Sequence, residues 1–188
     1  MQVLIVDNHD SFTFNLVEMI RQAGVENIGV VKNDEIDGNL LKEADKIIIS
    51  PGPGLPSETA NLYAVIKEYS STHSILGICL GFQTIVEVFG GTLKQLNQVQ
   101  HGIVSLVNAS EGEMIFRNIT SPFPVGRYHS WIANDIPDCL QVTAWTEGMV
   151  MGVRHKQLDV QGVQFHPESF LTPSGLKMMK NWLEKQTT

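Results

Sequence analysis

The stretch Ile75-Leu76-Gly77-Ile78-Cys79-Leu80-Gly81-Phe82-Gln83 decides how we interpret this chain. It begins as an apolar run, and the pattern of residues 84–89 predicts a helix after it. Glycines two residues before and after Cys79 permit the sharp strand-to-helix turn called a nucleophile elbow. Such a turn exposes the thiol at a helix N-terminus, where the helix dipole favours thiolate. The alternative is an unreactive buried cysteine, a common fate of this residue.

A second stretch, His166-Pro167-Glu168, follows an apolar run at residues 160–165 that predicts a strand. Proline disfavours helix for the residue before it, so His166 is expected to be extended. Residues i and i+2 of an extended chain point to the same side, which brings the Glu168 carboxylate beside the imidazole. Cys79, His166 and Glu168 would then form a nucleophilic triad. A surface histidine with a solvated glutamate is the alternative, and the elbow favours the triad.

These two stretches resemble the two signatures of the class I, triad-type glutamine amidotransferases. Further segments resemble the glutaminase subunits of anthranilate synthase and aminodeoxychorismate synthase. These segments are Val6-Asp7-Asn8-His9-Asp10-Ser11-Phe12-Thr13-Phe14-Asn15-Leu16, Ser50-Pro51-Gly52-Pro53-Gly54-Leu55-Pro56 and Arg127-Tyr128-His129-Ser130. The motifs occur in the right order, and the resemblance extends from Met1 to about Trp182.

The resemblance implies roles for the loop at 50–56. It gives the backbone N–H of Gly52, together with that of Leu80, to an oxyanion hole, and Gly52, Pro53 and Gly54 to glutamine binding. Two fixed donors suit the charge that develops on a tetrahedral intermediate. From the residues alone, a rigid turn built of proline and glycine is the alternative. A phosphate loop is disfavoured because no Gly-Lys-Ser/Thr follows.

Three other residues are expected to contact glutamine. Gln83 lies one helical turn after Cys79, so both side chains can face one pocket, and the resemblance implies that Gln83 contacts the substrate. It also implies that Ser130 and Trp131 bind the amino-acid end of glutamine, chiefly through backbone groups. The alternatives are an exposed helix glutamine for Gln83 and a core or rim aromatic for Trp131.

The activity that the resemblance implies is hydrolysis of L-glutamine to glutamate and ammonia through a Cys79 thioester, without a cofactor. Ammonia would pass to a separate chorismate-binding synthase subunit, which makes anthranilate or 4-amino-4-deoxychorismate. The sequence leaves the choice between these products open. The alternatives are a glutaminase for another synthase and a non-catalytic regulatory subunit with the same fold.

Composition sets the remaining expectations. A chain of 188 residues with 43% hydrophobic content predicts a single domain over residues 1–188. A net charge of −7 argues against nucleic-acid partners, and no apolar run is long enough to span a membrane. With no export signal, we expect a cytoplasmic protein. Two cysteines and scattered histidines predict neither a disulfide framework nor a metal site.

Apolar runs alternate with helical patterns up to Gly90-Gly91, and short strands follow as far as residue 153. This order predicts an α/β fold with an open, mostly parallel or mixed sheet and helices on both faces. Asp10 or Ser11 is expected to cap the first helix or to line a mouth that faces the partner. Thr172-Pro173 is expected to begin the last helix. Relatives commonly have Met-His-Gly-Lys where this chain has Gln100-His101-Gly102-Ile103, so only the His-Gly pair of that motif is kept.

Overall fold

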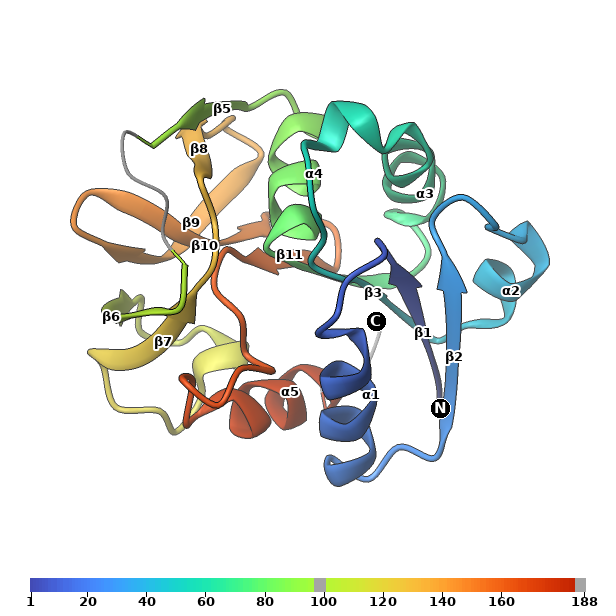
Figure 1. Cartoon of the computed structure of the whole chain (residues 1–188), viewed down its shortest axis with the longest axis horizontal. Helices are drawn as coiled ribbons and strands as arrows, with labels where there is room; N and C mark the ends of the chain where they lie inside the picture. The colour runs from blue at the N-terminus through green and yellow to red at the C-terminus, as the bar shows by residue number, and fades with distance from the viewer. Residues whose placement is uncertain (97–100, 185–188) are drawn as a thin grey trace.

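The computed structural model describes residues 1–96 and 101–184 (Figure 1). The strands are β1 (Gln2–Asp7), β2 (Asn27–Lys32), β3 (Lys46–Ile49), β4 (Ser74–Ile78), β5 (Thr92–Gln95), β6 (Ile103–Ala109), β7 (Phe123–Arg127), β8 (Trp131–Asp135), β9 (Leu140–Thr146), β10 (Met149–His155) and β11 (Val160–Val163). The α-helices are α1 (Thr13–Gln22), α2 (Gly38–Glu43), α3 (Ala60–Tyr69), α4 (Leu80–Val88) and α5 (Gly175–Glu184). Two 3₁₀ helices are η1 (Pro56–Glu58) and η2 (Met114–Phe116).

Within the described ranges, nine strands form one sheet in the order β2-β1-β3-β4-β11-β10-β9-β6-β7. Neighbours from β2 to β11 pair in parallel, and neighbours from β11 to β7 pair antiparallel. β5 and β8 form a separate antiparallel pair. The prediction of a mixed sheet is therefore confirmed.

Helices cover both faces of the parallel part, as predicted (Figure 1). On β1, Val3 and Ile5 belong to the core that holds α1 and α5, whereas Leu4 and Val6 belong to the core that holds α3 and α4. This alternation follows from the two-residue period of a strand. Because both faces are buried, the strands are apolar along their whole length, which is the pattern from which they were predicted.

The carboxyl ends of β3, β4 and β11 meet at one edge, because these strands are parallel neighbours. In open α/β sheets this edge is where ligands bind. The loop at 50–56 follows β3, the elbow follows β4, and His166 follows β11 after a short connection. Sheet topology thus gathers the three predicted site segments.

Two helix starts differ from expectation. α1 has no side-chain cap at its first turn; Asp10 Oδ1 instead accepts from the Phe12 N–H at 2.7 Å, just before the helix. α5 begins at Gly175, so Thr172-Pro173 does not begin the helix. Thr172 Oγ1 donates to the His166 carbonyl at 2.6 Å and accepts from the Gly126 N–H at 2.9 Å. The Thr172 hydroxyl therefore serves as the hydrogen-bond partner of a buried carbonyl and a buried N–H, rather than as a helix cap.

Candidate active site

Cys79 occupies a strained turn between β4 and α4, with φ 52° and ψ −98°. Such angles are rare for a non-glycine residue and persist only where the surroundings hold them. Here the Cys79 N–H donates to the Val163 carbonyl at 2.9 Å, and its carbonyl accepts from the Gln83 N–H at 3.0 Å. The strand-to-helix turn predicted from the sequence is therefore present.

Two glycines make this turn possible. A Cβ at Gly81 would lie 2.4 Å from the Ile49 carbonyl oxygen, and a Cβ at Gly77 would lie 2.5 Å from the backbone of Gly81. Both distances are well inside van der Waals contact, so larger residues would push α4 away from the sheet. The expectation of an exposed thiol is wrong, because Cys79 is only 6% exposed. Gln164 and His166 lie beside it.

His166 and Glu168 face each other as predicted. The Nδ1 of His166 donates to Glu168 Oε1 at 2.6 Å, and both side chains are buried. The His166 backbone is held in an extended bridge with Gly126, in which its N–H donates to the Gly126 carbonyl at 3.0 Å. A hydrogen bond from Nδ1 to a carboxylate fixes the tautomer and leaves Nε2 directed elsewhere.

Two aromatic rings hold the imidazole edge-on. The centroids of Tyr128 and Phe12 lie 4.9 Å and 5.5 Å from that of His166. In the part of the chain that the structure describes, His166 Nε2 makes no hydrogen bond to a nitrogen or oxygen atom, and the Cys79 side chain is its neighbour. Burial alone would lower the pKa of His166, but the negative charges of Cys79 and Glu168 outweigh burial and raise it well above 6.5. A protonated imidazole beside a thiolate is the arrangement that cysteine nucleophiles use.

Asn8 supports the loop that contains Gly52, a role that sequence reasoning missed. The Asn8 side chain donates to the Ser50 carbonyl at 2.8 Å, and its oxygen accepts from Asn33 at 3.0 Å. A Cβ at Gly52 would lie 2.5 Å from the Cβ of Asn8 and 3.0 Å from the side chain of Leu80. Gly52 therefore sits close to the elbow, where both expected oxyanion donors belong. No local signal marks this role, because the partners of Asn8, Ser50 and Asn33, are distant in sequence.

Pro53 and Gly54 are exposed beyond Gly52. Gly54 has φ +80°, and a Cβ there would lie 2.3 Å from Glu58 Oε2. That carboxylate accepts from the Leu55 N–H at 2.8 Å and so braces the far end of the loop. The loop is therefore a rigid turn that lies beside the elbow, and its role in glutamine binding stays a prediction.

Gln83 is buried rather than exposed, and its amide is already engaged. Its Nε2 donates to the Trp131 carbonyl at 2.9 Å and to Gln164 Oε1 at 3.2 Å. The Trp131 carbonyl also contacts His129 Nδ1 at 3.0 Å, and the Ser130 carbonyl accepts from the Leu96 N–H at 2.8 Å. The structure brings Gln83 and Trp131 together next to the elbow, but these two carbonyls are occupied by protein groups.

The unusual segment at 100–103 lies beside the site only in part. The ring of His101 packs edge-on against Tyr128 at 5.7 Å, and Ile103 begins β6 with its side chain exposed. Gln100 lies outside the described residues. Within those residues no group of three or more His, Cys, Asp or Glu side chains is arranged to hold a metal ion. None of the helices in the described ranges has both the length and the hydropathy that a membrane-spanning helix needs.

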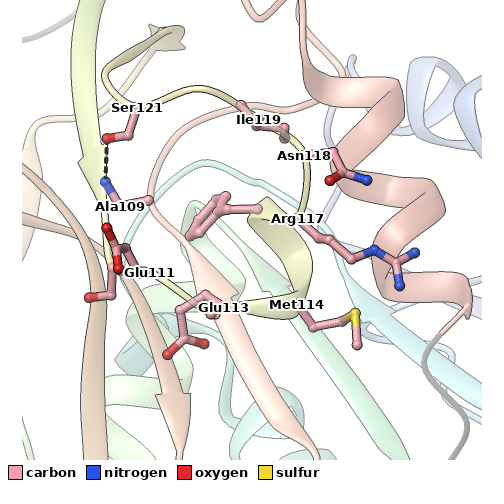
Figure 2. Close-up of a pocket in the computed structure, with 11 residues that line it drawn as sticks. Ala109, Glu111, Glu113, Met114, Arg117, Asn118, Ile119 and Ser121 are labelled. Atoms are coloured by element: carbon pink, nitrogen blue, oxygen red, sulfur yellow. Dashed lines mark hydrogen bonds between the residues drawn. The ribbon is translucent and has the colours of Figure 1, made fainter.

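A cavity of about 550 Å³ lies inside the loop from Ala109 to Ser121 (Figure 2). The Ser121 hydroxyl accepts from the Ala109 N–H at 3.0 Å and closes the loop. Of its three charged lining residues, Glu113 binds Arg154 and Arg117 binds Glu184, while Glu111 is exposed. The charges of Glu113 and Arg117 are thus neutralised by their partners, and we assign no chemistry to this cavity.

Comparison with known proteins agrees with this geometry. The sequence model of the family "Glutamine amidotransferase class-I" matches residues 4–186. Anthranilate synthase component 2 of Methanocaldococcus jannaschii is 45% identical, over 98% of this chain and 98% of its own length. Aminodeoxychorismate synthase component 2 of Escherichia coli is 41% identical, over 97% and 100%. The crystal structure of a glutamine amidotransferase from Thermotoga maritima has the same fold, with a TM-score of 0.79, 20% identity and coverage of 98% and 81%. The chain belongs to the class-I glutamine amidotransferase family.

Proposed function

We propose that this chain is the glutaminase subunit of a chorismate-using synthase. It hydrolyses L-glutamine and delivers ammonia to the synthase subunit, which makes anthranilate or 4-amino-4-deoxychorismate. The observation that carries this proposal is the Cys79 elbow facing a buried His166–Glu168 pair. Family membership and relatives named for both synthases support it.

The reaction begins when the Cys79 thiolate attacks the side-chain amide carbon of glutamine. The carbonyl oxygen becomes an oxyanion, which the N–H groups of Gly52 and Leu80 receive. His166 gives its proton to the amide nitrogen, the C–N bond breaks, and ammonia leaves a glutamyl thioester on Cys79. A water then attacks the thioester while His166 takes its proton. The C–S bond breaks, glutamate leaves, and Cys79 is again a thiolate.

Glu168 orients the imidazole and stabilises its positive charge without exchanging a proton with substrate. We therefore expect His166→Ala to lower the glutaminase rate more than Glu168→Gln does. Release of glutamate by each purified complex measures the difference. A larger loss for Glu168→Gln would reverse the two roles.

The surroundings of the triad suggest where the synthase subunit docks. Phe170 directly follows the Glu168-Ser169 pair and is 86% exposed. It lines a groove of about 510 Å³ between α1 and the beginning of α5, and Glu168 lines the same groove. Phe12 lines the groove too, directly after the 7–11 loop, and Asn8 of that loop donates to the Ser50 carbonyl. A partner on this side would therefore act on the orientation of the Gly52 N–H through Asn8. Removing one oxyanion donor lowers a rate by on the order of a hundredfold, so pre-organisation of this loop is a sufficient switch.

Weak glutaminase activity of the isolated chain and a rise in turnover on titration with the synthase subunit are therefore expected. Phe170→Ala should weaken the association. Trp145→Ala, an exposed aromatic on β9, is the matched control and should not. Full activity of the isolated chain, unchanged at saturating partner, would contradict this coupling. The chemistry also needs Cys79 as a free thiol, so we place the protein in the reducing cytoplasm.

The decisive experiment compares two nitrogen sources. In the complex with the synthase subunit, Cys79→Ala should abolish synthesis from glutamine and leave synthesis from added ammonium salt intact. Loss of both activities would make Cys79 a structural residue. A regulatory subunit without catalysis would release no glutamate in the wild-type complex. A glutaminase for another synthase would release glutamate but make no product from chorismate.

A further inference from the structure

We propose that the side-chain amide of Gln164 donates a hydrogen bond to the nucleophile, and that Gln83, His129 and Arg127 are positioning residues that hold this amide in place. The inference rests on the proposed glutaminase function. It gives a function to buried polar side chains that belong neither to the triad nor to the oxyanion hole.

Strand register brings Gln164 to the thiol. Val163, the last residue of β11, is the partner of Ile78, the last residue of β4, so the next residues of the two chain segments, Gln164 and Cys79, lie side by side. Gln164 Nε2 is 3.7 Å from Cys79 Sγ, which is hydrogen-bonding distance for sulfur. The Gln164 side chain is fully buried, and its backbone N–H donates to the Met151 carbonyl at 2.9 Å. The amide therefore reaches the sulfur from fixed backbone.

Gln83 sets the direction of that amide. Its Nε2 donates to Gln164 Oε1 at 3.2 Å, which leaves the Gln164 NH₂ group to face the sulfur. Because Gln83 lies one turn after Cys79 on α4, both groups move with the same helix. Its Nε2 also donates to the Trp131 carbonyl at 2.9 Å. The Gln83 nitrogen thus holds protein groups, and the contact of Gln83 with glutamine that the sequence predicts stays a prediction.

The Trp131 carbonyl is itself held by a buried chain. It accepts from His129 Nδ1 at 3.0 Å, and His129 Nε2 accepts from Arg127 Nε at 3.2 Å. This pattern needs a neutral His129 with its proton on Nδ1. Burial first, and then the charge of Arg127, lower the pKa of His129 to about 3, so the neutral form holds at neutral pH.

Arg127 is buried and anchors the chain to neutral groups. Its Nη1 donates to Ser105 Oγ at 3.1 Å and its Nη2 to Met149 Sδ at 3.2 Å. Its acidic neighbour, Glu147, is exposed and 3.9 Å away. The network runs from Arg127 on β7 to Cys79 in the turn after β4, and every step is a hydrogen bond between buried or half-buried groups. Fully satisfied buried networks of this kind make a geometry unique.

The consequence concerns the charged form of the nucleophile. A donor aimed at the sulfur stabilises thiolate more than thiol, because hydrogen bonding to a charged form favours that form. The titratable groups that face the same sulfur or its base are His166, Glu168, His129 and Tyr128. Gln164 adds a donor that does not titrate, so its contribution persists at every pH at which the protein is folded.

Gln164→Glu replaces this donor with an acceptor. The side-chain size and the oxygen that accepts from Gln83 are kept, and the group that faces the sulfur becomes a carboxylate oxygen, which also adds negative charge. In a Cys139→Ser background, the rate of Cys79 alkylation by iodoacetamide is measured against pH. We expect the profile to move up by about one pH unit, which slows alkylation at neutral pH about tenfold. The kcat for glutamine should fall at least about tenfold, whereas KM should change less than about threefold.

Two further variants keep the test decisive. Gln164→Met removes the donor without adding charge, and Gln83→Met releases Gln164 without touching the sulfur. Both should move the profile in the same direction by a smaller amount. Gln141→Glu is the matched control. Gln141 Oε1 accepts from Arg154 Nη2 at 2.8 Å, and a carboxylate oxygen at this position can accept the same hydrogen bond.

Alkylation profiles of the Gln164 and Gln83 variants that match the wild type, in proteins with wild-type thermal unfolding, would overturn the assignment. Glutaminase activity of the wild-type complex is measured in parallel. Its absence would overturn the proposed function, while the alkylation profiles would still report on the hydrogen bond. The two proposals therefore fail separately.

Discussion

β4 is buried at each of its five residues, whereas β6 buries one of its seven, Val107. The first belongs to the parallel half of the sheet, between two helical layers, and the second to the antiparallel half, which leaves Val104, Leu106 and Trp145 exposed. Helices on both faces leave the parallel strands no freedom to shift. The nucleophile, the Gly52 loop and His166 all follow strands of this half.

The antiparallel half contributes to the site differently. It places no proposed catalytic side chain at the strand ends, but it supplies the Gly126 carbonyl that binds the His166 backbone and the Arg127–His129 pair that holds the Trp131 carbonyl. The two halves of the sheet therefore have different roles. The ends of the parallel strands carry the reacting groups, and the antiparallel strands orient them. Substitutions matched between the halves can test it.

The largest difference should come from glycine positions. Gly81→Ala in the parallel half places a Cβ 2.4 Å from the Ile49 carbonyl oxygen and should destabilise the fold by about 4 kcal/mol or more. Gly148→Ala, at φ +74° in the β9–β10 turn, meets nothing within 4 Å and should lose about 1 kcal/mol from backbone strain alone. Chemical denaturation measures both. Equal losses would contradict the claim that the elbow is the tightly packed region.

The second-largest loss of stability should come from substitution of the buried Asn8. Asn8→Asp replaces the donor to the Ser50 carbonyl with an oxygen and buries a charge, which should lose about 3 kcal/mol of stability. Glutaminase activity should fall with it, since the Gly52 loop packs on Asn8. Asn108→Asp, exposed on β6, is the control and should change stability by about 0.5 kcal/mol or less. An active, stable Asn8→Asp protein would separate Asn8 from the loop.

His129 should make stability depend on pH. Its folded pKa of about 3 is below the unfolded value of 6.5, so the unfolded chain binds the proton first. The contribution of His129 to the free energy of unfolding is fully present above pH 6.5 and is lost as pH falls toward 3. Between pH 7 and pH 5 the loss should be about 2 kcal/mol. His129→Gln should remove most of this dependence in thermal unfolding, and an unchanged slope would mean that His129 titrates normally.

Cys139 should give the smallest effect. Its thiol donates weakly to the Phe89 carbonyl at 3.8 Å, away from the elbow, and serine can make the same bond. Cys139→Ser should change stability by about 0.5 kcal/mol or less and leave glutaminase activity unchanged. A marked loss of activity would assign this thiol a function that its surroundings do not explain.

Local sequence predicted the parts of the molecule that depend on local rules. The Gly77–Gly81 spacing predicted the strained turn, Pro167 predicted the extended His166, and apolar runs predicted the parallel strands. Asn8, Gln164 and Arg127 could not be predicted, because their partners lie on strands brought together only by the sheet. The prediction that Thr172 caps the last helix was wrong for the same reason. Its hydroxyl instead binds the backbone of Gly126 and His166, which are brought to it only by the folded sheet.

The account's central claim is that Cys79 is the nucleophile that attacks glutamine. The most direct test is to incubate the complex with a glutamine analogue that carries an electrophilic carbon in place of the amide, and to locate the label by peptide mass spectrometry. We predict one label, on Cys79, and protection by excess glutamine. A label on Cys139, or a label on Cys79 that glutamine does not prevent, would contradict the claim.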